Sequence, residues 1–179
     1  MTICKLLIWP DEKLLKISNK INLINNDVKS LVKDLIDTMK HEKNSAGIAA
    51  PQIGVNSCVF VININPDHNQ GNGTNGYEVF INPKIIKKCG TFNWEEGCLS
   101  IPGESGVVTR FETISISYIN LHGKTIEQEV DTYFSGCFQH ELDHLNGKLW
   151  INYQSKLKQN LIKEKMLKLK KKNSIVNMG

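Results

Sequence analysis

Two histidines and a glutamate in one short stretch are the residues of this chain best suited to hydrolytic chemistry. His140 and His144 are four positions apart, with Glu141 between them, in the run QHELDH at 139–144. On a helix this spacing places both imidazoles on one face, where they can bind one divalent ion, and directs the glutamate toward a water on that ion. The pattern predicts a catalytic metal site. Two ordinary helical histidines are the alternative, but they leave the glutamate unexplained.

A catalytic ion of this kind needs a third protein ligand and one open position. After His144 the sequence has no His, Cys or Asp, and its one acidic residue, Glu164, lies in a lysine-rich stretch. Trp150 stands at the position where a common class of zinc protease has its third histidine. We therefore expect the third ligand upstream of the two histidines.

The upstream candidates include a cysteine in a favourable segment. Cys98 lies in the stretch 95–100, which we interpret as a loop because Gly97 and Pro102 flank the cysteine and let the backbone approach a ligand closely. A thiolate is also a strong ligand for a divalent ion. The other upstream candidates are His41, His68, His122 and the remaining cysteines.

Arg110 is the only arginine among 22 basic residues. Its planar guanidinium can bind a carboxylate at two points, which lysine cannot do. We predict a buried or half-buried pair with Glu96 or Asp143, which would brace the cysteine segment against the helix that carries the histidines. A chance surface arginine is the alternative.

Hydrophobic patterns indicate the elements that must position these residues. Apolar side chains recur at helical spacing over 28–39, behind the capping candidates Asn26 and Asp27, and predict an amphipathic helix. Apolar and alternating runs predict strands, of which the last two form a hairpin around a turn at 120–123. These strands are predicted over residues 58–64, 77–82, 85–89, 113–119 and 124–130.

Two further helices are expected after the hairpin. The first carries the histidines, from a cap at Asp131 or Thr132 to a stop signal at 146–147, and the second spans about 155–171. This order predicts an α+β fold, in which antiparallel or mixed β-sheets pack around a central metal-binding helix, with an N-terminal amphipathic helix and a C-terminal helix. Residues 67–76 contain almost nothing that could be buried and are predicted to form a mobile loop.

Length and composition are typical of one globular domain. The chain has 179 residues, 40% of them hydrophobic and 22% charged, so we expect residues 1–179 to form a single catalytic domain. No apolar run is long enough for a membrane span, and the first residues lack a signal peptide, so we expect a cytoplasmic protein. The cysteines are odd in number and form no Cys-x-x-Cys pair, so we interpret them as reduced thiols, all but Cys98 being packing residues. They are Cys4, Cys58, Cys89, Cys98 and Cys137.

The basic charge is concentrated in the C-terminal helix and tail, at about 155–179. Residues 156–172 contain eight lysines and one acidic residue, although the net charge of the whole chain is only +4. Such a stretch can be a solvated helix face, a contact with the ribosome or a contact with an anionic membrane.

Three motifs, in this order, resemble those of peptide deformylases, the enzymes that remove the N-formyl group from the initiator methionine of nascent chains. They are GIAAPQ at 47–52, EGCLS at 96–100 and QHELDH at 139–144. The segments 9–11 and 81–83 and the final helix are also similar to the family. The resemblance therefore covers essentially the whole chain and implies a metal-dependent hydrolase that releases formate.

The resemblance implies roles for the residues of these motifs. Glu141 would take a proton from water and deliver it to the departing amine. The side-chain amide of Gln52 and the backbone N–H of Leu99 would stabilise the oxyanion, and a neutral amide suits this place because a lysine could pair with the thiolate instead. The metal would be held by Cys98, His140 and His144.

The resemblance also implies the partners and the cofactor. Peptides of the family bind in extended form, with the methionine in an apolar pocket. One divalent ion per chain is expected, Fe²⁺ in the cell, with Zn²⁺, Ni²⁺ or Co²⁺ as possible substitutes. The partners would be N-formylmethionyl peptides and, through the basic C-terminal helix, the ribosome, with no DNA partner. The substrate-binding residues would be Ala46, Gly47, Trp94, Gly97, Tyr133, Gly136 and Cys137, with His140 beside them.

Two other functions fit part of the pattern. A zinc endopeptidase of the His-Glu-x-x-His type would use His140, Glu141 and His144 with a third ligand other than Cys98. A non-catalytic, ribosome-associated metalloprotein would have a closed site with no open position for water.

Overall fold

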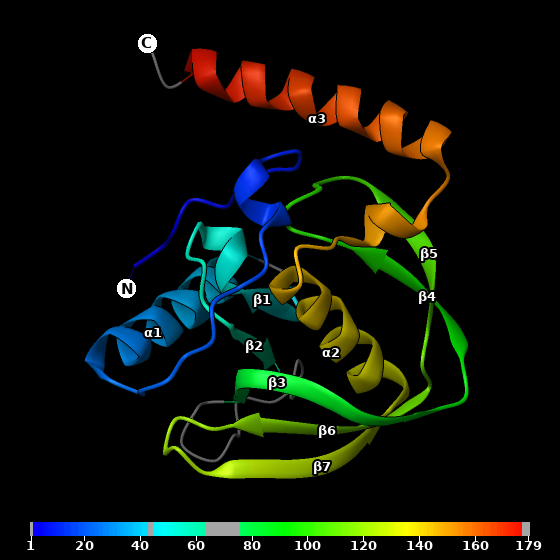
Figure 1. Ribbon diagram of the computed structural model, residues 1–179. Coiled ribbons are helices and arrows are strands. Elements are labelled where there is room, and N and C mark those ends of the chain that lie inside the picture. Colours follow the sequence, from blue (N-terminus) through cyan, green and yellow to red (C-terminus); the bar gives the residue numbers. More distant parts are fainter. Residues whose placement is uncertain (1, 43–44, 64–75, 177–179) are drawn as a thin grey trace.

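The computed structural model describes residues 2–42, 45–63 and 76–176, with side chains up to residue 172. Two antiparallel sheets lie around a central helix, α2 (Figure 1). The larger sheet has the strand order β1-β2-β3-β6-β7, and the smaller one pairs β4 with β5. The strands are β1 (Gly47–Ala49), β2 (Val59–Asn63), β3 (Tyr77–Cys89), β4 (Phe92–Gly97), β5 (Ser105–Arg110), β6 (Thr113–Ile119) and β7 (Thr125–Asp131). The helices are α1 (Asn26–His41), α2 (Thr132–Leu145) and α3 (Lys156–Val176), with short 3-10 helices η1 (Glu12–Leu15), η2 (Ala50–Ile53) and η3 (Trp150–Tyr153).

The predicted α+β class is confirmed, and the central helix is the one that carries both histidines. Antiparallel pairing joins all neighbouring strands of the two sheets. Helix α2 contacts strands of both sheets, including β1 and β5. The expectation that residues 1–179 form one domain stays a prediction.

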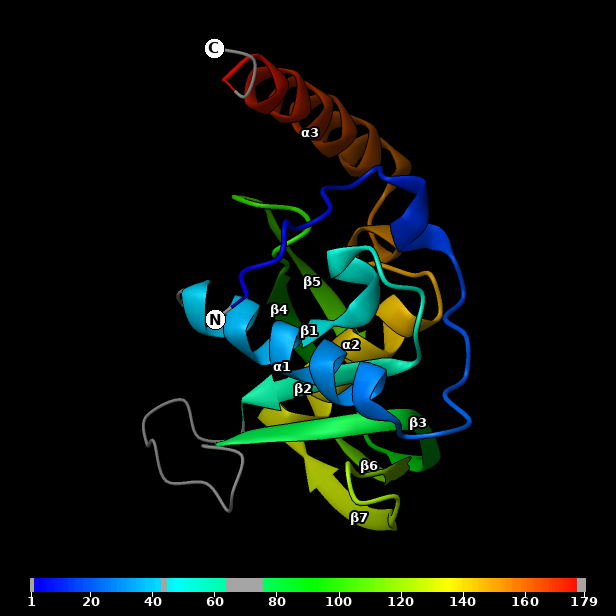
Figure 2. The ribbon, with the colours of Figure 1, turned by 90° about the vertical axis from the view of Figure 1, so that its left-hand side faces the viewer.

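Strand β2 is apolar and buried from Val59 to Ile62, because both of its faces are covered. Phe60 and Ile62 belong to the core between the larger sheet and α2, whereas Val59 and Val61 belong to the core beneath α1. Figures 1 and 2 show α1 and α2 on opposite sides of β1 and β2. Burial on both faces turns the usual alternation of a strand into a continuous apolar run.

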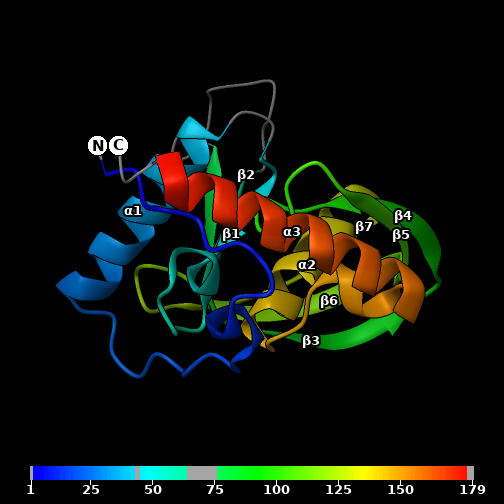
Figure 3. The ribbon, with the colours of Figure 1, turned by 90° about the horizontal axis from the view of Figure 1, so that it is seen from above.

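Helix α3 lies across the rest of the molecule in the view from above (Figure 3), and two of its side chains belong to a third core. Ile162 and Met166 are buried against a cluster that includes Trp9, Leu14 and Trp150. Most of the basic side chains of α3 are exposed, but Lys158 and Lys170 are half-buried, and Lys158 donates to the carbonyl of Ser105 at 2.9 Å. In the part of the chain that the structure describes, no helix has the length and apolar character needed to cross a bilayer.

Two predicted helix boundaries were wrong. The side chain of Asn25, rather than Asn26 or Asp27, caps α1 by accepting a hydrogen bond from the N–H of Val28 at 3.1 Å. Helix α3 continues beyond the predicted end at residue 171, to Val176. The predicted start of α2 is confirmed, because the helix begins directly after Asp131, although the Asp131 side chain makes no cap hydrogen bond.

Two strand predictions also need correction. The runs 77–82 and 85–89 form one strand, β3, with an irregular register between them. The irregularity falls at Asn82, which has a φ of 48° and whose side-chain amide bonds both the N–H and the carbonyl of Ile21. The segment from Glu95 to Gly97, predicted as loop, belongs to β4. The predicted mobile loop at 67–76 lies outside the described residues except for Gly76.

Candidate metal centre and active site

Cys98, His140 and His144 lie together at the centre of the molecule. The possible ligand atoms of these three residues are all within 4.8 Å of one another. Cys98 Sγ lies 3.3 Å from His144 Nε2. Helix α2 supplies both imidazoles from successive turns, as their spacing predicted, and the cysteine follows the last residue of β4. This donor set, one thiolate and two imidazoles, suits a divalent transition metal.

The orientation of His140 is fixed by a carboxylate on β4. His140 Nδ1 lies 2.6 Å from Glu96 Oε2, and because a carboxylate only accepts hydrogen bonds, Nδ1 carries the proton. The other nitrogen, Nε2, is therefore left to bind a metal. Burial alone would raise the pKa of Glu96, but the hydrogen bonds from His140 and Arg110 hold it below its ordinary value.

Arg110 makes the predicted contact, and it does so with both carboxylates. Its guanidinium donates to Glu96 at 2.6 and 3.0 Å and to Asp143 at 2.7 Å, and the side chain is only 5% exposed. Burial alone would lower the pKa of Arg110, but the two carboxylates raise it, so the group stays charged. Arg110 thus joins β4, β5 and α2 behind the histidine.

Sequence reasoning missed the outer member of this network, Tyr153. Its hydroxyl donates to Asp143 at 3.0 Å, and its ring lies 5.0 Å from the guanidinium carbon of Arg110. Tyr153 belongs to η3, far from Arg110 in the sequence. No local pattern marks it, because the contact depends on how the chain returns after α2.

Glu141 is a buried carboxylate beside the three candidate ligands. Its side chain is almost fully buried, and Oε2 has no hydrogen-bond partner among the described residues. Burial raises the pKa of Glu141 to about 7, with the nearby charge of Glu96 adding to this effect and that of His140 opposing it. A carboxyl group with a pKa near neutrality can both take up and release a proton at physiological pH.

Gly47 on β1 leaves room for this carboxylate. A Cβ at position 47 would lie 2.7 Å from Glu141 Oε1, closer than real Cβ contacts. The glycine is therefore required by the close approach of β1 to the side chain of Glu141.

The side-chain amide nitrogen of Gln52 faces Cys98, one of the three candidate ligands. The N–H of Ala49 donates to Gln52 Oε1 at 2.8 Å, which fixes the orientation of the amide. Gln52 Nε2 then lies 3.6 Å from Cys98 Sγ and 3.4 Å from Ser100 Oγ. Because Gln52 is 2% exposed and held in this way, its N–H donor is preorganised. Ser100 was not predicted as a site residue.

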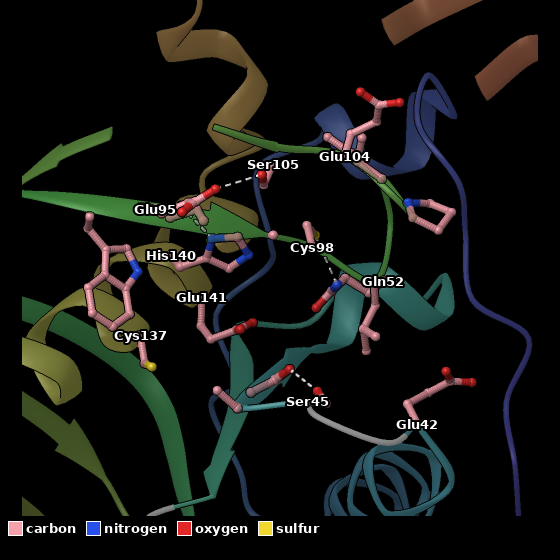
Figure 4. Close-up of a pocket in the computed structure, with 18 of the residues that line it drawn as sticks. Glu42, Ser45, Gln52, Glu95, Cys98, Glu104, Ser105, Cys137, His140 and Glu141 are labelled. Carbon is pink, nitrogen blue, oxygen red and sulfur yellow. Dashed lines mark hydrogen bonds and ion pairs between the residues drawn. The ribbon is translucent and has the colours of Figure 1, made fainter. Parts of the chain in front are cut away.

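An open cavity of about 610 Å³ leads to these groups. Figure 4 shows His140 and Glu141 from α2, Gln52 from η2 and Cys98 from the segment after β4 converging on it. The residues predicted to bind substrate line the cavity, with one exception, and so does the catalytic candidate Leu99. The lining includes Ala46, Gly47, Trp94, Gly97, Leu99, Tyr133 and Cys137.

Gly136 is the exception. It does not belong to the cavity lining, and a Cβ there would lie 3.0 Å from the indole ring of Trp94. The glycine in the middle of α2 therefore makes room for that ring, which in turn contacts Tyr133 at a centroid distance of 5.4 Å. The prediction that Gly136 lines the pocket was wrong because the indole lies over it.

The other candidate ligands lie elsewhere. His41 and His122 are exposed, at the end of α1 and in the hairpin turn, and His68 lies outside the described residues. All five cysteines are free thiols. Cys89 is exposed at the end of β3, so its interpretation as a packing residue was wrong, since the end of β3 projects beyond the covered part of the sheet.

The fold and this group of side chains define a candidate metal-dependent hydrolase. Helix α2 offers two imidazoles and a carboxylate with an unpaired oxygen, the segment after β4 adds a thiolate, and a buried amide faces the thiolate. A site with three protein ligands and an adjacent cavity corresponds to a catalytic rather than a structural metal site.

Comparison with known proteins identifies the family. A family model described as polypeptide deformylase matches residues 3–160. A peptide deformylase of Buchnera aphidicola subsp. Schizaphis graminum is 41% identical over 172 residues, which cover 96% of this chain and 99% of the relative. A peptide deformylase of Baumannia cicadellinicola subsp. Homalodisca coagulata is 39% identical over 169 residues, which cover 94% of this chain and 97% of the relative.

Solved structures agree with these relatives. A crystal structure of a peptide deformylase from Legionella pneumophila has a TM-score of 0.86 at 35% identity and covers 97% of this chain and 98% of that one. A crystal structure of a peptide deformylase from Ehrlichia chaffeensis in complex with actinonin has a TM-score of 0.85 at 31% identity. It covers 94% of this chain and 98% of that one. The chain belongs to the polypeptide deformylase family.

Proposed function

We propose that this chain is a metal-dependent hydrolase that removes the N-formyl group from the N-terminal formylmethionine of nascent polypeptides and releases formate. The observation that carries the proposal is the meeting of Cys98, His140 and His144 beside the unpaired carboxylate of Glu141 at an open cavity. The relatives and solved structures described above are peptide deformylases, which supports the same reaction.

The residues present fit one divalent ion. A thiolate and two imidazoles lie within reach of one another, and Glu96 orients one imidazole from behind. When bound, such an ion would lower the pKa of a water molecule to near neutrality. We propose Fe²⁺ as the native ion, with Zn²⁺, Ni²⁺ or Co²⁺ as substitutes, and metal analysis of protein purified without oxygen tests this choice.

Glu141 and Gln52 supply the remaining chemistry in this proposal. The Glu141 carboxylate takes the proton of the attacking water and delivers it to the amine that leaves. The Gln52 amide and the backbone N–H of Leu99 donate to the oxyanion that develops on the formyl oxygen. Gln52 is held for this purpose by its bond from Ala49, so little reorganisation is needed in the transition state.

The cavity provides the place for the methionyl peptide. Trp94, Tyr133 and Cys137 form its apolar part, and the edge of β1 at Ala46 and Gly47 offers backbone groups to an extended chain. Among the described strands, β1 pairs with β2 alone, so no strand occupies its other edge.

Glu141→Gln tests the reaction directly. The native protein, assayed without oxygen and with added Fe²⁺, is expected to release formate from formyl-Met-Ala-Ser. The variant keeps the shape of the side chain but loses the base, so its rate is expected to fall by about 10²–10⁴-fold. Its metal content should stay unchanged. Absence of formate from the native protein, or cleavage of internal peptide bonds, would reject the proposal in favour of an endopeptidase or a non-catalytic metalloprotein.

We also propose that the protein acts in the cytoplasm and binds the ribosome through α3. The support is the row of exposed lysines on α3, including Lys163, Lys168 and Lys171. Deletion of the helix is a poor test, because Ile162 and Met166 close a hydrophobic core. Replacement of the exposed lysines by Gln keeps that core and removes the charge.

The lysine variant is expected to sediment with ribosomes less than the native protein does at low salt. Attraction to RNA falls steeply with salt concentration, so the difference should shrink as salt rises. A matched variant with Lys84→Gln and Lys87→Gln, on exposed positions of β3, serves as control. Equal sedimentation of all three proteins at low salt would reject ribosome binding through α3.

A further inference from the structure

Tyr153 contacts the charged side chains behind His140 in two ways. Its hydroxyl donates to Asp143 Oδ2 at 3.0 Å, and the same oxygen accepts from Arg110 Nη1 at 2.7 Å. Its ring lies 5.0 Å from the guanidinium carbon of Arg110, a distance typical of a cation–π contact. The tyrosine therefore touches both members of the Arg110–Asp143 pair.

The contacts behind His140 form a closed chain. Arg110 donates to Asp143 with Nη1 and to Glu96 with Nε and Nη2, so the two carboxylates bind different parts of one guanidinium. Glu96 in turn lies 2.6 Å from His140 Nδ1. Helix α2 closes the chain, because it carries both His140 and Asp143. A rotation of the Asp143 carboxylate would therefore tilt the guanidinium and shift the carboxylate that orients His140.

Tyr153 is more exposed than the pair that it contacts. It is 48% exposed, whereas the side chains of Asp143 and Arg110 are 15% and 5% exposed. A half-exposed residue in contact with a buried pair limits the access of water to that pair. Burial and the nearby charge of Asp143 raise the pKa of Tyr153, so the hydroxyl keeps the proton that it donates.

The short helix η3 holds the tyrosine in this place. Trp150, at its start, is fully buried, and a Cβ at Gly106 on β5 would lie 2.6 Å from the indole ring. Gln154, directly after η3, donates its side-chain amide to the carbonyl of Val107 at 2.8 Å. Both contacts fasten η3 to β5, the strand that ends at Arg110. The fold itself therefore sets the position of the tyrosine relative to the guanidinium.

Resting on the metal site of the proposed function, we propose that Tyr153 is a positioning residue, whose hydroxyl fixes the orientation in which His140 binds the metal. The effect passes through Asp143, Arg110 and Glu96, each of which holds the next by a hydrogen bond. Tyr153 does not belong to the cavity lining, so it acts on the metal ligand and not on the substrate.

Tyr153→Phe tests the role of the hydroxyl, because it keeps the ring. Loss of a group that holds a metal ligand directly typically lowers metal affinity by about 10–100-fold, so this more distant hydroxyl should contribute about 3–10-fold. Competition between the protein and a chelator for Co²⁺ measures the dissociation constant. The matched control is Tyr77→Phe, which removes a hydroxyl at the first residue of β3, outside this network, and should leave the constant unchanged.

The visible spectrum of the Co²⁺ protein separates positioning from folding. The absorption bands depend on the geometry of the ligands, so a rotated imidazole should change them in Tyr153→Phe. A loss of stability alone would leave the spectrum of the folded protein unchanged. At saturating metal, kcat for formyl-Met-Ala-Ser is expected to fall by about twofold to fivefold with KM unchanged, because the hydroxyl does not contact the substrate.

A double-mutant cycle with Asp143→Ala tests the route of the effect. Without the carboxylate the hydroxyl has lost its acceptor, so adding Tyr153→Phe should change the Co²⁺ dissociation constant by less than about twofold. If Asp143→Ala does not fold, the spectrum of Tyr153→Phe alone decides.

The outcomes separate the two proposals. An unchanged Co²⁺ affinity or spectrum in Tyr153→Phe, an equal change in Tyr77→Phe, or an equally large effect in the Asp143→Ala background would overturn the positioning role and leave deformylation standing. If the native protein binds no Co²⁺, or releases no formate, the proposed function itself is overturned.

Discussion

Two ion pairs of similar length connect elements near the active site, and they differ in their access to water. Arg110 donates to Glu96 at 2.6 Å with side-chain exposures of 5% and 1%, whereas Lys165 donates to Glu104 at 2.8 Å with exposures of 61% and 19%. The first pair lies behind a candidate metal ligand. The second pair joins α3 to the mouth of the cavity. Distance alone does not distinguish them, but burial does.

Burial changes what happens when one partner is removed. A charge left alone in the interior loses both its partner and its water, which costs about 3–5 kcal/mol. An exposed partner regains water, so exposed pairs contribute between about 0 and 1 kcal/mol. The buried group around Arg110 is therefore expected to fix the geometry of the site, and the exposed pair to contribute little to folding.

Arg110→Ala gives the largest expected effect. Glu96 and Asp143 would both lose a buried charged partner, so the free energy of unfolding should fall by about 3–5 kcal/mol. Glu96 would also hold His140 less firmly, and loss of such a supporting contact typically lowers metal affinity by about 10–100-fold. Urea unfolding of the metal-free protein and competition with a metal chelator measure the two effects.

Arg110→Lys is the matched variant for this experiment. It keeps the positive charge but cannot bind two carboxylates through a planar fork, so both effects should be intermediate. A stability and metal affinity of Arg110→Ala close to those of the native protein would show that the buried network does not position His140.

Gly47→Ala tests the close approach on the other side of the site, with a smaller expected effect on stability. The new methyl group would lie 2.7 Å from Glu141 Oε1, so the carboxylate must move. Overpacking of this kind costs about 1–3 kcal/mol, and a displacement of about 1 Å can lower the rate by up to ~10²-fold. Metal content should not change, because the three atoms nearest the new methyl group all belong to Glu141, which is not a candidate ligand.

If the Gly47→Ala variant has the same kcat as the native protein, the Glu141 side chain can move aside without loss of function. Kinetics with formyl-Met-Ala-Ser, together with the urea midpoint, distinguish a displaced base from a destabilised fold. A fall in stability with unchanged kcat per folded molecule would point to the fold alone.

The sequence predicted those parts of the site that depend on local spacing. His140, Glu141 and His144 are placed by the period of one helix, and the absence of ligands after His144 directed attention to Cys98. Arg110 could be assigned to its carboxylates because a single arginine in a lysine-rich chain suggests a need for two-point binding.

The parts that the sequence did not predict depend on long-range packing. Strands β4 and β5 were not predicted, because exposed residues interrupt their buried and half-buried positions and leave no continuous apolar run. The contact of Tyr153 with Asp143 likewise depends on where separate segments end in space. No local pattern encodes such placements.

Lys165→Met gives the smallest expected effect and completes the comparison with Arg110. Methionine keeps most of the aliphatic stem, so the change removes the charge with little loss of packing. The free energy of unfolding should change by no more than about 1 kcal/mol, because water replaces the lost partner of Glu104. A double-mutant cycle with Glu104→Gln measures the coupling directly, and it should lie well below that of Arg110 with Glu96. A coupling above about 2 kcal/mol would mean that the Lys165–Glu104 pair stabilises the fold as strongly as a buried pair does. Exposure to water would then not explain the difference between this pair and the Arg110–Glu96 pair.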